Sequence, residues 1–313
     1  MNFPVFDLHC DTANVLVGDG ASQFGSLKKN DTHIDLQRAG ALPGYAQCFA
    51  CFTTTDLGRN PVDIFERKLA SILRELDKNR DVIRQVYSAD EIEENRKNGI
   101  MSALLTIEGP AGFGFDPILL EDLYKVGFRM TTLGWNENNP LTGSHITGGG
   151  LTDLGRTYVK EAQKLGMIVD VSHISDEGFW DIMDITQAPI VASHSNSRRV
   201  WNVSRNLTDD MFLQICKTGG VAGINLYTEF IGDHPDLDAV CDHVFHFMEL
   251  DPDGKHISLG GDLDGCESLP DGFNGVQDYP RLAQRLLKRG LDEATVYNIF
   301  WNNALGVIDR CCI

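Results

Sequence analysis

The sequence predicts an α/β fold of the (β/α)8 class, the TIM barrel. Eight short apolar runs recur along the 313 residues, and most are followed by a polar or glycine-rich turn and then by a helical pattern. Strands that alternate with helices imply right-handed crossovers and a parallel sheet. Eight repeats of this unit favour a closed barrel over an open sheet. We expect one barrel domain over residues 1–313, because α/β barrels reach this length without dividing.

The apolar runs that we predict to be strands are five to eight residues long. They lie at 5–9, 45–52, 102–108, 129–133, 167–172, 189–194, 221–226 and 256–262. No Gly-x-Gly-x-x-Gly pattern follows the first run, which weakens a dinucleotide-binding fold as an alternative. Three glycines at 148–150 precede a helical pattern without a Walker lysine, so we interpret them as a flexible loop and not as a phosphate cradle.

Helical patterns lie between these runs. The longest spans 61–87, where Pro61 suits a first helical turn. Its apolar face is formed by Ile64, Leu69, Ile72, Leu73 and Leu76. Further helices, each opened by a residue type that caps helices, are predicted at 153–165, 176–185 and 208–217. Two amphipathic helices, at 280–288 and 292–301, are expected to pack on the barrel and complete its wall.

The charge of the chain limits its partners. Lys and Arg number 27 against 45 Asp and Glu, which gives a formal net charge of −18. Nucleic acids and anionic membranes favour basic surfaces, so we expect neither as a partner and a small molecule instead. Too few residues precede Asp7 for a secretion signal, and no run approaches the roughly 18 apolar residues of a membrane span. We therefore expect a soluble, cytoplasmic protein.

The eight cysteines are scattered through a chain that is large enough to fold without disulfides, so we expect reduced thiols. Cys48 and Cys51 form a Cys-x-x-Cys pattern, but it lies in a strand-like run and no second pair accompanies it. We interpret this pair as packing residues and not as a metal or redox site.

The first predicted strand ends in a pattern with metal-ligand spacing. In the stretch DLHCDT at 7–12, His9 and Asp11 are two residues apart, so a strand directs both to one side and Cys10 to the other. Imidazole nitrogen and carboxylate oxygen suit zinc and similar divalent ions. A lone His-x-Asp also fits a buried histidine that is hydrogen-bonded to an aspartate, so the rest of the chain must decide.

Four more side chains that can bind metals lie at the carboxyl ends of other predicted strands. They are Glu108, His173, His194 and Asp262. In a parallel barrel the carboxyl ends of the strands converge on the face where active sites are built. Together with His9 and Asp11 these side chains exceed what one tetrahedral zinc needs. Six such ligands fit two metals about 3.5 Å apart, bridged by one carboxylate, with open positions for water and substrate.

Five motifs in order carry a resemblance to a known family. They are DLHCDT at 7–12, IEG at 107–109, VSH at 171–173, SHS at 193–195 and GGDLDG at 260–265. From its first strand into its C-terminal helices, the chain resembles the membrane (renal) dipeptidase family, peptidase family M19 of the amidohydrolase superfamily. The resemblance implies a barrel of the metal-dependent amidohydrolase type, with two zinc ions as cofactors and dipeptides as substrates.

The resemblance also implies how the metals are shared. His9 and Asp11 would bind one zinc, His173 and His194 the other, and Glu108 would bridge them. Asp262 would lie beside the first metal and the catalytic water. A carboxylate there can accept the proton of the water and pass it to the leaving amine.

Substrate-binding residues follow from the same resemblance. Arg205, in SRN at 204–206, matches the family's arginine for the substrate carboxylate, and it would hold a free C-terminus by a two-pronged contact. Tyr227, in NLY at 225–227, resembles a residue of the family's pocket. Tolerance of a D-residue at the second position and a possible homodimer are further implications.

One segment departs from the family. Animal members carry a histidine in a Thr-Leu-Thr-His run after the fourth strand, thought to polarise the scissile carbonyl, whereas this chain reads TLGWN at 132–136. Asn136 could donate a hydrogen bond to the developing oxyanion, and Trp135 could wall the pocket. His145, in the loop 138–150, is close enough in sequence to reach the site.

Two alternatives stay open. The same scaffold and metals could cleave another amide, a lactam or a lactone, because the fold alone does not set the substrate. The missing histidine also suits a catalytically silent metal-binding relative, although an intact Asp262 argues against that. We interpret Asp264 as a turn residue that supports the site. Four histidines lack metal-ligand spacing, namely His234, His243, His246 and His256.

Overall fold

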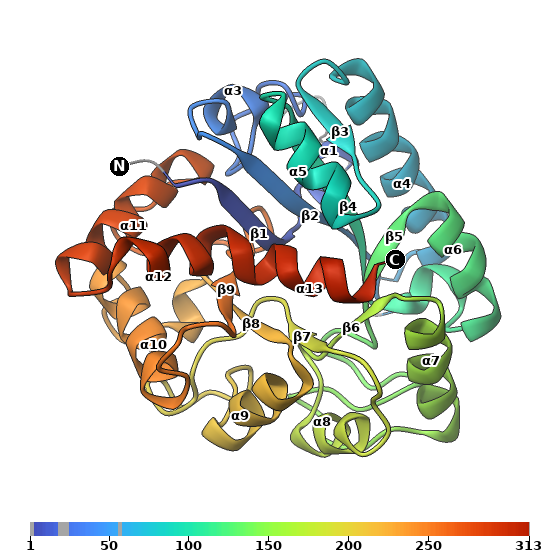
Figure 1. Cartoon of the computed structure of the whole chain (residues 1–313). Helices are drawn as coiled ribbons and strands as arrows, with labels where there is room; N and C mark the ends of the chain where they lie inside the picture. The colour runs from blue at the N-terminus through green and yellow to red at the C-terminus, as the bar shows by residue number, and fades with distance from the viewer. Residues whose placement is uncertain (1–2, 18–24, 56–57, 313) are drawn as a thin grey trace.

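The structure, a computed structural model, describes residues 3–17, 25–55 and 58–312 (Figure 1). All of its paired strands run parallel and follow one another around a ring. The strands are β1 (Val5–Cys10), β2 (Tyr45–Phe52), β3 (Ile83–Gln85), β4 (Met101–Glu108), β5 (Phe128–Thr132), β6 (Ile168–Asp170), β7 (Ile190–Ala192), β8 (Val221–Ile224) and β9 (Ile257–Leu259).

β2 closes the ring. It pairs with β1 on one side and with β4 on the other, where Phe52 lies opposite Glu108. Eight strands therefore form a closed barrel, as the sequence predicts, and each overlaps one of the eight predicted runs. β3 pairs with the first residues of β4 and adds a short edge outside the ring.

The predicted helix 61–87 is too long. α4 (Pro61–Lys78) begins after Asn60, whose side chain caps the first turn, and Asn79 follows its last residue as the C-cap. A turn then leads into β3, which the sequence analysis missed. The error has a physical reason: no glycine or proline separates α4 from β3, but the polar stretch 77–81 ends the apolar face of the helix.

Helices cover the outside of the ring (Figure 1). Four of them agree with the predicted ranges to within two residues, including α11 (Tyr279–Lys288), which was predicted at 280–288. Three of the four begin after Thr152, Ser175 and Thr208, whose hydroxyls accept a backbone N–H of the first turn. These three are α7 (Asp153–Lys164), α8 (Asp176–Met183) and α9 (Asp209–Thr218). The other outer helices are α1 (Thr12–Val17), α3 (Leu36–Ala39), α5 (Ala89–Lys97), α6 (Leu120–Val126) and α10 (Leu237–Leu250). Over the described ranges, no helix combines the length and the apolar character that a membrane span requires.

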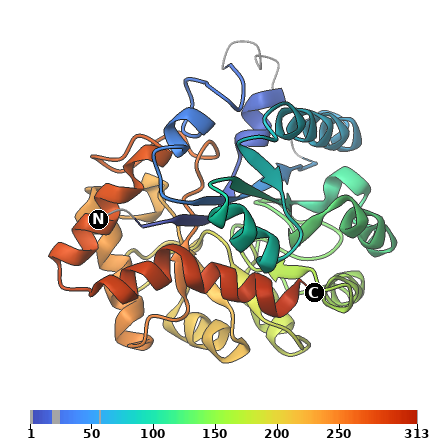
Figure 2. The same ribbon diagram turned by 45° about the horizontal axis from the view of Figure 1, so that its top comes forward.

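The C-terminal segment closes the amino-terminal end of the barrel. The predicted helix 292–301 corresponds to α12 (Glu293–Tyr297) and a π-helical turn (Asn298–Asn302), and α13 (Asn303–Cys311) continues from them. α13 lies across the barrel in both views (Figure 2). Its Val307 and Ile308 belong to one apolar cluster with Phe6 and Val221, which stand near the beginnings of β1 and β8. The opposite end of the barrel, where the strands finish, is left for a site.

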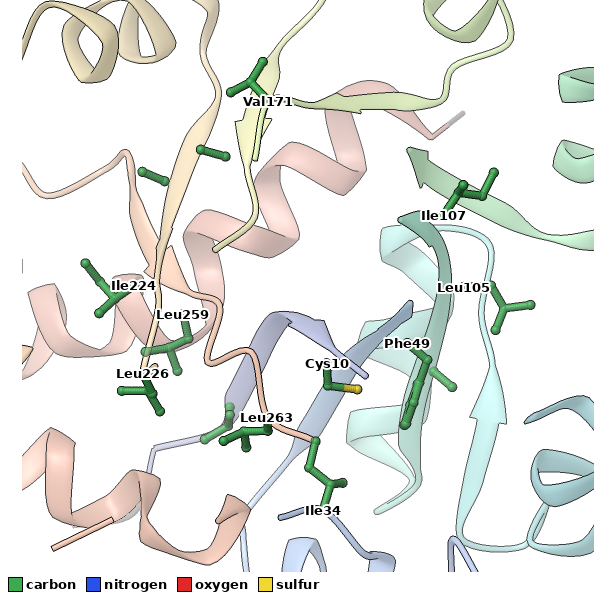
Figure 3. Packing of buried hydrophobic residues seen from close by; sticks show 14 of the residues in the cluster. Cys10, Ile34, Phe49, Leu105, Ile107, Val171, Ile224, Leu226, Leu259 and Leu263 are labelled. Atoms are coloured by element: carbon green, nitrogen blue, oxygen red, sulfur yellow. The ribbon is translucent and has the colours of Figure 1, made fainter. Parts of the chain in front are cut away.

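A second apolar layer lies between the strands and the helices. Figure 3 shows Cys10 in this layer, beside Phe49 and Leu263 and near Ile34. Cys10 is fully buried there, as the alternation along the first strand predicts. All eight cysteines are free thiols, and both cysteines of the Cys-x-x-Cys pattern are buried.

Candidate metal centre

The six predicted ligands meet at the carboxyl-terminal end of the barrel. His9 lies in β1 and Glu108 is the last residue of β4. The others lie in loops just past β1, β6, β7 and β9, namely Asp11, His173, His194 and Asp262. All six are buried. They include two groups of three whose ligand atoms lie within 4.8 Å of one another and could hold a metal, and His9 belongs to both groups.

A β-bulge directs the first two ligands. Asp7 pairs with Gln47 and Cys10 pairs with Phe49, so β1 holds one residue more than β2 over this stretch. A bulge of this kind turns side chains at the rim of a barrel. It lets His9 point to the centre while Cys10 points to the outer apolar layer. The side-chain amide of Asn14 donates to Oδ1 of Asp11, which leaves Oδ2 on the side of His9.

Glu108 stands between two groups of ligands. Its Oε2 lies 3.4 Å from Nε2 of His9. Its Oε1 lies 3.0 Å from Nε2 of His173 and 3.8 Å from Nε2 of His194. On the Oε2 side is a group that we call the carboxylate half, made of His9, Asp11 and Asp262. On the Oε1 side is the imidazole half, made of His173 and His194.

The imidazole half fits a divalent cation. Nδ1 of His173 lies 2.9 Å from Oδ1 of Asn136, and Nδ1 of His194 lies 2.6 Å from Oγ of Ser193. Oγ of Ser193 accepts this hydrogen bond, because its hydroxyl already donates to the carboxylate of Asp170. Both rings therefore carry their proton on Nδ1.

The two Nε2 atoms of His173 and His194 are 3.0 Å apart. With the protons on Nδ1, both Nε2 atoms direct lone pairs at each other and at Oε1 of Glu108. Three acceptors aimed at one point repel unless a cation lies among them. Burial lowers the pKa of both rings well below the ordinary value for histidine, which keeps them in the neutral form that binds metals.

The carboxylate half concentrates negative charge. Nε2 of His9 lies 3.3 Å from Oδ2 of Asp11 and 3.8 Å from Oδ1 of Asp262. Burial opposes a charge on His9, but the carboxylates of Glu108 and Asp11 outweigh it and raise the pKa of His9 well above its ordinary value. Burial raises the pKa of Asp262 to about 7, and the charges of Asp11 and Glu108 add to this shift. A divalent cation relieves this repulsion, so this half fits one as well.

Two of the ligands have a strained backbone. His173 has φ 69° and Asp262 has φ 56°, both in the left-handed region that non-glycine residues seldom adopt. Each costs about 1–2 kcal/mol, and such residues gather where the surrounding structure enforces a functional geometry.

Arg205 brings a buried positive charge beside the centre. It is 4% exposed, and its Nη1 donates to Oγ of Ser195 at 2.8 Å. Its Nε and Nη2 have no hydrogen-bond partner among the described residues. Burial lowers the pKa of Arg205, and the charges of Asp262, Asp170 and Glu108 oppose that shift. Two buried, unpaired donors on a guanidinium suit an anionic group.

A cavity of about 150 Å³ opens onto the ligands and is also lined by Phe52, Trp135 and Asn14. The rings of Phe52 and Trp135 meet edge to face at 5.1 Å. Nζ of Lys68 lies 4.9 Å from the centre of the Phe52 ring and donates to the Phe52 carbonyl. Trp135 therefore walls the cavity, as one of the sequence interpretations has it.

The other predicted residues differ in how near they lie to the ligands. Asn136 contacts His173 through its Oδ1. Tyr227 packs edge to face on Phe230 at 5.0 Å, and its backbone N–H donates to Oδ1 of Asn225. The side-chain amide of Asn225 donates to Asp262, so these contacts connect Tyr227 with the carboxylate half only through Asn225. Asp264 accepts hydrogen bonds from Thr12 and from the backbone of His33, which agrees with its interpretation as a supporting turn residue.

The sequence did not identify several residues that support the ligands, among them Asn14, Asp170 and Ser193. Asp170 is an acidic residue inside the otherwise apolar β6, and it is 2% exposed. A buried carboxylate in a strand must be satisfied by donors. It accepts the backbone N–H groups of Ser172 and Ser193, both next to imidazole ligands. That placement was a usable signal of a supporting role.

Comparison with known proteins adds independent findings. The family described as membrane dipeptidase, peptidase family M19, matches residues 1–311. An uncharacterized dipeptidase of Schizosaccharomyces pombe is 35% identical over 214 residues, which are 66% of this chain and 52% of the yeast protein. The match thus spans about half the length of that relative.

Solved structures agree with the barrel. The metallopeptidase dipeptidase AC, of family M19, superposes with a TM-score of 0.90 at 25% identity, over 100% of this chain and 99% of that one. A metallopeptidase from Rhodobacter sphaeroides, solved with a phosphinate mimic of the dipeptide L-Ala-D-Ala, also has a TM-score of 0.90, at 24% identity over 99% of this chain and 100% of that one. These likenesses confirm the predicted (β/α)8 fold.

Proposed function

The chain belongs to the membrane dipeptidase family, peptidase family M19, and on that premise we propose that it is a metal-dependent dipeptidase with two zinc ions. Its substrates are dipeptides, including those with an L-residue followed by a D-residue. The reaction is hydrolysis of the single peptide bond. The fold places the candidate ligands at the end of the barrel where such sites are built.

The observation that carries the proposal is the position of Glu108. Its two carboxylate oxygens face different ligands, Oε2 toward His9 and Oε1 toward His173 and His194, and the rings of His9 and His194 stack at 3.8 Å beside it. A single-metal site has no need of a carboxylate with a ligand group on each side. We assign His9, Asp11 and Asp262 to one ion, His173 and His194 to the other, and Glu108 to both.

Bound zinc ions supply Lewis acidity, which lowers the pKa of water and polarises a carbonyl. The chain itself supplies the proton acceptor. Nδ2 of Asn225 donates to Oδ2 of Asp262 at 3.2 Å and fixes that carboxylate, while Oδ1 faces His9. Asp262 accepts the proton of the attacking water and delivers it to the leaving amine, which requires only that both lie within hydrogen-bond reach.

Arg205 binds the C-terminal carboxylate of the substrate. Its unpaired Nε and Nη2 match the two oxygens of a C-terminal carboxylate. The guanidinium is buried close to Asp262 and Glu108, so a carboxylate bound there has its peptide bond near the ligands. The cavity of about 150 Å³ at the centre suits a small substrate and disfavours a longer peptide.

The proposal is tested with a panel of L-L and L-D dipeptides on the zinc-loaded chain. We expect turnover of several members, and none after removal of the metals with a chelator. No turnover of any dipeptide at full metal occupancy would contradict the proposal. Lactams and lactones in the same panel identify an enzyme that cleaves another bond, and a panel wholly without turnover identifies a silent metal-binding relative.

A further inference from the structure

The loop 138–150 forms backbone hydrogen bonds with the connection that follows β6. The backbone N–H of His145 donates to the carbonyl of His173 at 2.9 Å. Ser144 and Ile174 form an antiparallel bridge, and the N–H of Ser175 donates to the carbonyl of Gly143. His173 is therefore held in its left-handed conformation by backbone contacts from a segment that lies 28 residues earlier in the chain.

The ring of His145 reaches the same ligand from another side. Its Nε2 lies 2.9 Å from Oδ1 of Asn136, and the same oxygen lies 2.9 Å from Nδ1 of His173. Its Nδ1 lies 2.9 Å from Oγ of Ser204, the residue before Arg205. Four side chains thus form one chain of hydrogen bonds, Ser204, His145, Asn136 and His173.

The donors and acceptors of this chain can be assigned. An amide oxygen only accepts hydrogen bonds, so Nδ1–H of His173 and Nε2–H of His145 both donate to Oδ1 of Asn136. His145 then has a lone pair on Nδ1, which accepts a hydrogen bond from the hydroxyl of Ser204. Burial, with the charges of Arg205 and Arg198, lowers the pKa of His145 to about 4, which agrees with this neutral form.

We propose that His145 and Asn136 are positioning residues that fix the tautomer and the direction of His173 and thereby set the metal affinity of the imidazole half. The proposal rests on the metal centre of the proposed function. Neither residue needs to touch the substrate. Both ring nitrogens of His145 are occupied, and so is the amide oxygen of Asn136, so neither group is free to polarise a carbonyl through these atoms.

The other imidazole ligand supports this assignment. His194 is held in the same tautomer by unrelated residues, Ser193 and Asp170. Two separate arrangements that place a proton on Nδ1 leave Nε2 free in each case. Partners of this kind typically change metal affinity about 10- to 100-fold when they are removed.

The test is a titration of the metal-free chain with Co²⁺, followed by calorimetry and by the visible absorption of the bound ion. We expect two equivalents in the unaltered protein. In H145A and N136A one equivalent should bind about 10- to 100-fold more weakly, with a changed absorption spectrum, while the other equivalent is unaffected. N136D retains an oxygen acceptor and should keep the affinity of both equivalents near that of the unaltered protein.

A matched control separates positioning from folding. His246, on α10, is a partly buried histidine whose Nε2 pairs with Asp209 at 2.8 Å on another part of the molecule. H246A should bind both equivalents like the unaltered chain. If H145A or N136A does not fold, S204A, which removes only the outer end of the chain of hydrogen bonds, carries the test with a smaller loss at the same equivalent.

Two results would overturn the inference. The first is unchanged binding of both equivalents in H145A and N136A, or in S204A where that variant carries the test. The second is equal weakening of both equivalents, which indicates a general structural effect. Dipeptide turnover is measured separately: metals that bind as expected without any turnover would remove the proposed function and leave this inference intact.

Discussion

The two halves of the metal centre are held in different ways. In the imidazole half each ligand ring has a hydrogen-bond acceptor behind it, Asn136 for His173 and Ser193 for His194. In the carboxylate half, Nδ1 of His9 has no hydrogen-bond partner within the described part of the chain.

The carboxylate half is positioned through its backbone instead. Asp7 accepts the backbone N–H of His9 at 2.9 Å and that of Gly261, the residue before Asp262, at 3.1 Å. It also accepts the hydroxyl of Tyr279 at the beginning of α11. Because Asp7 lies in β1 and Gly261 follows β9, one side chain joins the two strands that supply this half.

This difference in support indicates that the two halves bind a cation in different ways. The imidazole half presents neutral nitrogens whose direction is set by side chains, so its affinity depends on orientation. The carboxylate half gathers negative charge in a buried space, so its affinity depends on charge. Substitutions should therefore affect mainly one half or the other, except at Glu108, which faces both, and at His9, whose ring stacks on His194.

The largest effect is expected for Glu108→Gln. The neutral amide cannot offer a charged oxygen to each side, so both metal equivalents should bind more weakly and dipeptide turnover should fall to background. Metal titration and turnover assays measure the two effects. If one equivalent keeps its full affinity, Glu108 belongs to one half only and the two-sided arrangement is wrong.

Asp262→Asn separates charge from proton transfer within the carboxylate half. We expect turnover to fall by about 10²- to 10⁴-fold, because general acid–base catalysis is lost. Two metals should still bind, the one in the carboxylate half more weakly, because a charged ligand has become neutral. Asp253→Asn, at an exposed aspartate paired with Lys255, is the matched control and should have no effect. Retained turnover in Asp262→Asn would refute its role as the proton acceptor.

Arg205→Ala removes the guanidinium beside the metal centre and leaves the ligands of both halves unchanged. The loss in kcat/KM should be on the order of a hundredfold for dipeptides with a free C-terminus, because a buried charge pair is lost. Arg199→Ala, at an exposed arginine in the same segment, should have little effect. An equal loss on dipeptides amidated at the C-terminus removes the assignment of Arg205.

Ser193→Ala and Asp7→Asn test the contrast between the halves most finely. The first removes the acceptor behind His194 and should weaken one metal equivalent about tenfold. The second removes the buried charge that holds His9 and Gly261, so it should weaken the other equivalent and lower the free energy of unfolding by about 1–3 kcal/mol. Metal titration and denaturant unfolding measure both. The contrast fails if the two variants weaken the same equivalent.

Much of the fold follows from local patterns. All eight barrel strands overlap predicted runs, because short apolar runs that alternate with capped helices leave few alternatives. β3 was not predicted, because it lies within the predicted helix 61–87 and no glycine or proline separates it from α4. α1, α3, α5, α6, α10 and α13 were also not predicted. Their packing on the barrel, such as the contact of α13 with the strand beginnings, involves residues far apart in the sequence.

The six candidate ligands were predictable for a related reason. Each lies at or just past the carboxyl end of a predicted strand, and a parallel barrel brings the ends of its strands together. The contacts that orient the ligands could not be predicted. The bulge in β1 depends on the pairing with β2, and the contact of His145 with Asn136 depends on how the loop 138–150 folds onto the connection after β6. Long-range contacts of this kind leave no periodic pattern in a single sequence.

Anomalous diffraction from crystals grown with zinc tests the central claim most directly. A two-metal centre should give two peaks about 3.5 Å apart, one beside His9 and Asp11 and the other beside His173 and His194, with Glu108 between them. A single peak, or two peaks on the same side of Glu108, would contradict it.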